Sequence, residues 1–135
     1  MATSLLSETV REQRASRYAG IRSAADGSSA VVWVESHISQ AAVGYPIAPS
    51  TPMVDGFAAE FSNGKRNLWG ARIQFLESES CYNSALACEG IALAGDRVTT
   101  FTSGQALILM KEVLYAIAGK HLPVVFHIAA AAITA

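Results

Sequence analysis

The chain has 135 residues and a mass of 14.2 kDa, which is enough for one domain with a buried core. Its formal net charge of −1 provides no positive footprint for nucleic acid or for an acidic membrane surface. No apolar run reaches the length of about 18 residues that a transmembrane helix needs. Two cysteines are too few to ligate an iron–sulfur cluster on their own. We therefore expect no nucleic-acid partner, no membrane span and no route for electrons through this chain alone.

Residues 1–25 differ in composition from the rest and are interpreted as an N-terminal extension. They are rich in Ser and Ala, and arginines recur at positions 11, 14, 17 and 22. This pattern is typical of an organelle-targeting segment, although Glu8 and Glu12 are unusual in one. The alternative is an exposed helix whose charges face solvent. A secretory pattern is absent, so we expect the cytoplasm or an organellar matrix and not secretion.

From residue 28 onward, the apolar pattern alternates between helical and strand-like periods. Expected helices cover residues 29–38, 52–61, 82–93 and 105–117, and expected strands cover residues 41–45, 71–75, 98–102 and 124–128. The strands are mostly continuous apolar runs, which is typical of parallel sheets covered by helices. The sequence therefore predicts an α/β domain with an open, mostly parallel sheet. We expect one face and one edge of this sheet to stay uncovered and to favour association.

The stretch from Tyr45 to Met53 organises this pattern, because its three prolines cannot sit inside a helix or a central strand. It predicts a buried strand, a rigid turn and a helix capped by Ser50 or Thr51, with Pro52 in its first turn. In open α/β sheets, the turn at the carboxyl end of a strand is where ligands bind. The turn is therefore interpreted as a pocket loop.

Four ordered motifs in this chain resemble those of one enzyme family. They are Tyr-Pro-Ile-Ala-Pro-Ser-Thr-Pro-Met at 45–53, Lys-Arg-Asn-Leu-Trp-Gly at 65–70, Thr-Thr-Phe-Thr-Ser-Gly-Gln at 99–105, and Leu-Pro-Val-Val-Phe-His at 122–127. Together they are similar to the N-terminal region of pyruvate:ferredoxin oxidoreductases, which are thiamine-diphosphate-dependent 2-oxoacid:acceptor oxidoreductases. The resemblance implies that residues 26–135 form a thiamine-type pyrimidine-binding domain in truncated form.

Three positions depart from the family pattern, and all three belong to its active site. Ala48 stands where the family has a Thr that contacts the oxoacid. Cys81 stands where it has the Glu that hydrogen-bonds the thiamine pyrimidine, and Ala131 where it has an Arg for the substrate carboxylate. A thiol is mostly neutral near pH 7 and a weak acceptor, and alanine offers no charge. We therefore expect no catalytic, cofactor-binding or metal-binding residues here. In the alternative, Glu79 replaces the lost Glu, which requires a shift in the alignment with the family. The spacing from Gly70 to Cys81 and from Cys81 to Gly90 matches the family and disfavours this shift.

Two hypotheses about function follow. The first is a non-catalytic domain that acts as a structural or interaction subunit of a larger assembly, with other protein chains or further copies of itself as partners. The second is the pyrimidine-side subunit of a split 2-oxoacid (pyruvate):ferredoxin oxidoreductase, in which thiamine diphosphate and Mg bind only when partner chains complete the site. A chain that is a fragment of a longer product also remains open.

Other conspicuous residues are given structural interpretations. His127 is expected to be a core histidine that bonds to the backbone, and Trp33 and Trp69 are expected to be packing residues. Cys81 and Cys88 share a helix face but are too far apart for a disulfide, and a reactive Cys81 at a helix N-terminus is the alternative to an inert one. The turn at residues 102–105 opens a helix, and we expect it to cap that helix rather than hold a phosphate.

Overall fold

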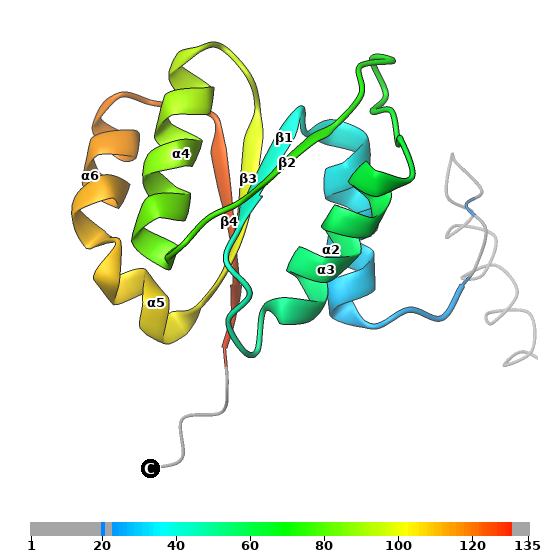
Figure 1. The fold of residues 1–135 in the computed structure, drawn as a ribbon, viewed down its shortest axis with the longest axis horizontal. Coiled ribbons are helices and arrows are strands. Elements are labelled where there is room, and N and C mark those ends of the chain that lie inside the picture. The colour runs from blue at the N-terminus through cyan, green and yellow to red at the C-terminus, as the bar shows by residue number, and fades with distance from the viewer. Residues whose placement is uncertain (1–19, 21–22, 131–135) are drawn as a thin grey trace, which may run out of the picture.

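The computed structural model describes residue 20 and residues 23–130, which fold around one parallel four-stranded sheet (Figure 1). The strands are β1 (Ala41–Gly44), β2 (Gln74–Glu77), β3 (Val98–Ser103) and β4 (Val124–Ala129). Their order across the sheet is β2-β1-β3-β4, and every neighbouring pair is parallel. The predicted α/β class with an open parallel sheet is confirmed. The proposed extension at residues 1–25 lies largely outside the described residues.

Helices cover both faces of the sheet. The helices α2 (Gly27–Ile38) and α3 (Thr51–Ser62) lie on one face, and α4 (Cys81–Leu93), α5 (Gly104–Leu109) and α6 (Lys111–Gly119) lie on the other (Figure 1). The expectation of an uncovered sheet face is therefore wrong for the described residues. Each crossover between parallel strands of the sheet passes through at least one helix, which is the usual connection in parallel sheets.

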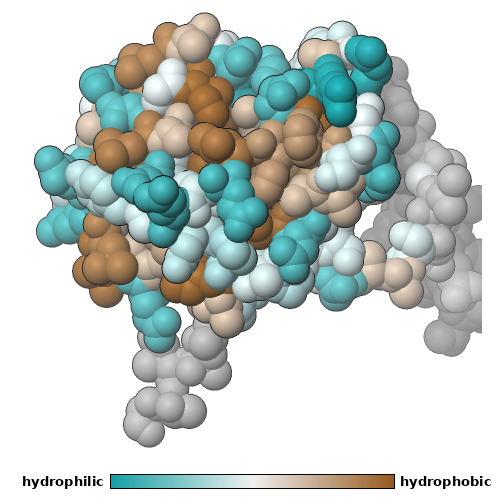
Figure 2. Space-filling model, viewed as in Figure 1, coloured by the Kyte–Doolittle hydropathy of each residue, from teal (hydrophilic) through white to brown (hydrophobic). Residues whose placement is uncertain are grey.

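The core forms where the two central strands meet these helix layers. Every residue of β1 and β3 is buried, because each strand has neighbours on both sides and helices on both faces. On the side of α2 and α3, the aromatic rings of Phe57 and Phe101 are fully buried, with their centroids 5.9 Å apart. On the other side, α4 and α6 pack through Ala85, Met110 and Val113. The surface seen in Figure 2 mixes polar and apolar residues.

Two predicted elements differ from the observed ones. The strand expected at residues 71–75 is Gln74–Glu77, because Arg66 and Arg72 first close an antiparallel bridge that holds the preceding residues in a loop. The helix expected at residues 105–117 is two helices, α5 and α6, which are separated at Met110. Met110 has φ −99° and ψ 10° and is fully buried. Apolar positions continue across this break in helical period, so the pattern could not reveal it.

Side chains cap three of the helices as their sequences require. Asp26 precedes α2 and accepts a hydrogen bond from the backbone N–H of Ser29 at 2.8 Å. In the same way, Ser80 caps α4, and Ser103 caps α5, which is the capping role predicted for the turn at 102–105. No helix among the described residues is long and apolar enough to cross a membrane.

Candidate functional site at the carboxyl edge of the sheet

The predicted pocket loop, residues 45–50, lies at the carboxyl end of β1, next to the carboxyl end of β3. The chain proceeds from β1 to β2 on one side and reaches β3 and β4 on the other, so this edge lies at a topological switch point of the sheet. Ser50 precedes α3 as predicted, but its hydroxyl makes no capping bond. Instead, both its backbone N–H and its hydroxyl donate to the carbonyl of Ile47, at 2.8 Å and 2.7 Å. These bonds close the loop on itself.

Gly44 lets α3 approach this edge closely. A Cβ atom placed on Gly44 would lie 2.8 Å from the Cγ1 atom of Val54, which is closer than two carbon atoms tolerate. The absence of a side chain at residue 44 therefore allows the first turn of α3 to pack directly on the end of β1.

The candidate active-site residues lie in different environments. Ala48 is exposed on the loop and joins Pro49 through a cis peptide bond. Cys81 is the first residue of α4, and only 6% of its surface is exposed, in an apolar cluster with Ala85, Ala106 and Met110. Ala131 lies outside the described residues.

The loop and Cys81 meet through apolar contacts. Tyr45 and Ile47, which precede Ala48 on the loop, pack against the same cluster that holds Cys81. Glu77 and Glu79 are the acidic residues nearest to Cys81 in sequence, and both are exposed. Cys81 itself is buried against apolar side chains.

A network of serines, which the sequence analysis missed, ties three elements together beside Cys81. The hydroxyl of Ser78 contacts the carbonyl of Gly44 at 3.4 Å and the carbonyl of Ser80 at 2.9 Å. It also contacts the hydroxyl of Ser84 on α4. These contacts join the ends of β1 and β2 to the beginning of α4. Their signal in the sequence is only a run of serines and acids before an apolar helix.

His127 meets a buried carboxylate, and the predicted bond to the backbone is wrong. Its Nε2 atom lies 2.8 Å from Oε1 of Glu35 on α2, and the hydroxyl of Ser39 donates to Oε2 at 2.6 Å. Burial raises the pKa of Glu35, but the hydrogen bonds from His127 and Ser39 outweigh it and leave the pKa below its ordinary value. The two residues are 92 positions apart, so sequence spacing gave no hint of the pair.

The two cysteines are buried, whereas the two tryptophans are exposed. Cys81 and Cys88 are both free and buried, as expected of residues too distant for a disulfide. Burial raises the pKa of the Cys88 thiol to about 12.

Trp33 and Trp69 are 67% and 62% exposed, so their assignment as packing residues is wrong. No group of His, Cys, Asp and Glu in the described ranges could hold a metal ion.

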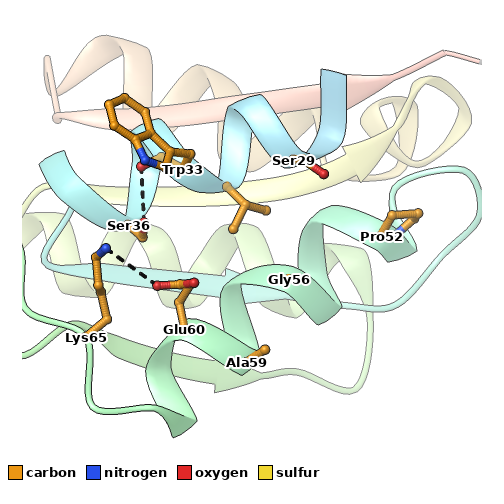
Figure 3. A pocket seen from close by; sticks show the side chains of 9 residues that line it. Ser29, Trp33, Ser36, Pro52, Gly56, Ala59, Glu60 and Lys65 are labelled. Carbon is orange, nitrogen blue, oxygen red and sulfur yellow. Dashed lines mark hydrogen bonds and ion pairs between the residues drawn. The ribbon is translucent and has the colours of Figure 1, made fainter. Parts of the chain in front are cut away.

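A groove of about 360 Å³ lies between α2 and α3. Trp33, Ser36, Glu60 and Lys65 gather at one end, and Ser29 and Pro52 lie at the other (Figure 3). Neither Ala48 nor Cys81 lines it. The groove is therefore separate from the carboxyl-edge site.

Comparison with known proteins agrees with the motifs. The family model described as "Pyruvate flavodoxin/ferredoxin oxidoreductase, thiamine diP-bdg" matches residues 34–135. A pyruvate-flavodoxin oxidoreductase from Klebsiella pneumoniae is 40% identical over 108 residues, which are 80% of this chain and 9% of that protein. A pyruvate-flavodoxin oxidoreductase from a Nostoc species is 41% identical over 110 residues, which are 82% of this chain and 27% of that protein. A pyruvate dehydrogenase [NADP(+)] from Cryptosporidium parvum is 36% identical over 114 residues, which are 84% and 6% of the respective chains.

Among solved structures, the fold matches a 2-oxoglutarate:ferredoxin oxidoreductase from Magnetococcus marinus, determined with 2-oxoglutarate, coenzyme A and succinyl-CoA bound. The TM-score is 0.69 at 19% sequence identity, and the match covers 99% of this chain and 24% of that chain. The chain thus spans less than a third of the length of each of these relatives.

Proposed function

Because the chain belongs to the pyruvate flavodoxin/ferredoxin oxidoreductase family and matches its thiamine-diphosphate-binding part, we propose that it is a non-catalytic member of that family. In this proposal, residues 26–135 form a pyrimidine-type domain that acts as a structural or interaction subunit of a larger assembly. Residues 1–25 form an extension that is either a targeting segment for an organellar matrix or an exposed helix of a cytoplasmic protein.

The burial of Cys81 supports this proposal more than any other observation. The resemblance implies that an acidic residue at this position drives the thiamine pyrimidine to the tautomer that accepts a proton from the thiazolium carbon. A carboxylate does this by accepting a hydrogen bond strongly, whereas a neutral thiol accepts weakly. Cys81 is also packed among Ala85, Ala106 and Met110, so its sulfur fills apolar space. The residues present therefore do not fit the cofactor.

The exposed methyl group of Ala48 points to the same conclusion. The resemblance implies that a hydroxyl at this position contacts the oxoacid, and a methyl group can neither donate nor accept a hydrogen bond. We accordingly propose that this chain alone binds neither thiamine diphosphate nor Mg, and that no residue of it is catalytic.

A second candidate function is the pyrimidine-side subunit of a split pyruvate:ferredoxin oxidoreductase. The observation that favours it is the carboxyl-edge loop, whose strand, closed turn and capped helices keep an ordered arrangement beside Cys81. In that case, partner chains would supply the groups that hold thiamine diphosphate and Mg, together with the iron–sulfur clusters.

The test is the native mass of the endogenous protein after gentle extraction, with identification of the chains that co-purify. The proposal predicts a large assembly that lacks thiamine-enzyme subunits. Co-purification with cluster-bearing oxidoreductase chains would instead support the split enzyme. A species at the mass of the single chain would contradict both.

A further inference from the structure

Large apolar side chains are exposed at the amino edge of the sheet, opposite the loop of Ala48. The segment between α3 and β2 projects from this edge (Figure 1), and its Leu68 and Trp69 are 70% and 62% exposed. The backbone N–H of Leu68 donates to the carbonyl of His37 at 2.8 Å, which brings the segment against the last turn of α2. The ring of His37 in turn lies 4.6 Å from the ring of the exposed Trp33. These apolar groups therefore gather on one surface.

The turn that carries Leu68 and Trp69 is held by a buried side chain. Asn67 is 6% exposed, and its Nδ2 atom donates to the carbonyl of Ser39 at 3.3 Å. Its Oδ1 atom accepts from the backbone N–H groups of Trp69 and Ala71, at 3.1 Å and 3.0 Å. Gly70 closes the turn with φ +79°, a conformation that side-chain-bearing residues rarely adopt. A turn fixed in this way loses little conformational entropy when a partner covers it.

Three arginines lie on this edge of the sheet, and none of them forms a salt bridge with a carboxylate of the described residues. The guanidinium of Arg72 lies over the ring of Phe61, with its Cζ atom 5.7 Å from the ring centroid. Arg97 lies over the ring of Trp69, with its Cζ atom 5.6 Å from the ring centroid. Arg66 donates to the carbonyl of Gly70 at 2.7 Å, and Arg72 bridges to Arg66 through the backbone. Contacts with a ring or a carbonyl leave Arg66 and Arg72 without an ion pair, whereas the charge of Arg97 also helps to lower the pKa of the Glu35 carboxyl. Although the whole chain carries a net charge of −1, the three arginines outnumber the exposed Asp96 on this edge.

We propose that this surface binds an acidic segment of a partner protein that carries large apolar side chains. The amino-edge surface consists of Trp33, Arg66, Leu68, Trp69, Arg72 and Arg97. Tryptophan and arginine are the residues most enriched among interface anchors, and a rim of arginines selects carboxylates by charge and by paired hydrogen bonds. The proposal rests on the proposed interaction role of the chain and names the chemistry of its partner.

A protein segment explains this surface better than a nucleic acid does. The aliphatic side chain of Leu68 is the most exposed of the apolar groups and offers no face on which a base could stack. The exposed Asp96 precedes Arg97, and the groove beside Trp33 contains the carboxylate of Glu60, paired with Lys65 at 3.7 Å. These acids would repel a phosphate backbone and an acidic segment alike, so the choice between the two partners rests on the aliphatic contact that Leu68 offers.

The experiment measures the binding of fluorescent peptides to the full chain by anisotropy. Three peptides of equal length are compared, in which Leu and Phe alternate with Glu, with Lys or with Ser, and oligouridylate is the nucleic-acid probe. We expect the Glu peptide to bind most tightly and to weaken as ionic strength rises. The double variant Leu68→Ser/Trp69→Ser should lose about tenfold or more in affinity, as truncation of an interface anchor does. Arg97→Gln should lose about threefold, as an exposed charge does.

Matched controls stand on the opposite helix layer. Ile108 on α5 is 76% exposed, and Lys111 lies over the ring of Tyr115 much as Arg97 lies over Trp69. Ile108→Ser and Lys111→Gln should therefore bind the Glu peptide like the unmodified chain. Equal binding of the Glu and Lys peptides, tighter binding of oligouridylate, or unchanged binding by the double variant would each overturn the proposal. Because this readout involves no 2-oxoacid chemistry, its failure is distinct from a failure of the proposed function.

Discussion

Replacing Cys81 with Glu tests whether the carboxyl-edge site is closed to a charged carboxylate. The introduced carboxyl group would enter an apolar cluster in which Cys81 is only 6% exposed. Desolvation of this kind raises the pKa of a glutamic acid by about 3 units. At about 1.4 kcal/mol per unit, keeping the group ionised would cost about 4 kcal/mol. The N-terminus of α4 offsets about 1 to 2 kcal/mol, because the helix dipole favours an anion there.

The net expectation is that Cys81→Glu is about 2 to 3 kcal/mol less stable near pH 8 than Cys81→Gln, which has the same size and no charge. A glutamic acid with a raised folded pKa contributes no penalty below its unfolded pKa, and it costs stability as pH rises above that value. The two variants should therefore unfold at the same urea concentration near pH 4 and diverge toward pH 8. Equal stability at pH 8 would refute the reasoning, because it would mean that position 81 accepts a carboxylate as an active site does.

Three further predictions concern the core. Glu35→Gln should reduce the free energy of unfolding by about 1 to 2 kcal/mol at neutral pH. Because the pKa of Glu35 is lowered in the folded chain, this loss should vanish in urea unfolding experiments as acid protonates the carboxyl. A loss that does not depend on pH would contradict the pair with His127. Cys88, whose thiol pKa is about 12, should resist iodoacetamide in the native chain and react only in urea, as measured by mass spectrometry; native alkylation would show that it is accessible. Gly56→Ala should lower the midpoint of thermal unfolding, because the added Cβ atom would lie 2.9 Å from Cγ2 of Val32. Adding Val32→Ala to this variant should restore part of the lost stability. A midpoint above that of the unmodified chain would contradict this close packing.

The layers of the fold could be predicted because local patterns encode them. The strands predicted at residues 41–45, 98–102 and 124–128 match β1, β3 and β4 to within one residue at each end. Their signal is a run of small apolar, β-branched and aromatic residues, which is buried throughout in β1 and β3 and only partly in the edge strand β4. The break at Met110 could not be predicted, because the residue keeps its apolar contacts while its backbone leaves the helix.

Some features of the candidate site could likewise be predicted from local sequence, and others depend on how distant elements pack. The sequence could place Ala48 on a rigid loop at the carboxyl edge and Cys81 at the N-terminus of a helix, because the prolines and the apolar helical period act locally. It could not foresee that Glu35 meets His127, because that contact depends on how α2 packs against β4. The exposure of Trp69 was missed for a similar reason. Tryptophan is usually buried, but here Asn67 occupies the interior of the turn and leaves the ring outside.

The most direct test of the central claim compares 2-oxoacid decarboxylation by the purified native assembly with that of the same assembly carrying Cys81→Ala. Cys88→Ala is the matched control, because it also truncates a buried cysteine of α4, away from the carboxyl edge. A non-catalytic subunit predicts that neither variant changes the rate, whatever that rate is. Loss of pyruvate decarboxylation in Cys81→Ala, with the assembly intact and Cys88→Ala unaffected, would contradict the account and identify this chain as part of a working active site.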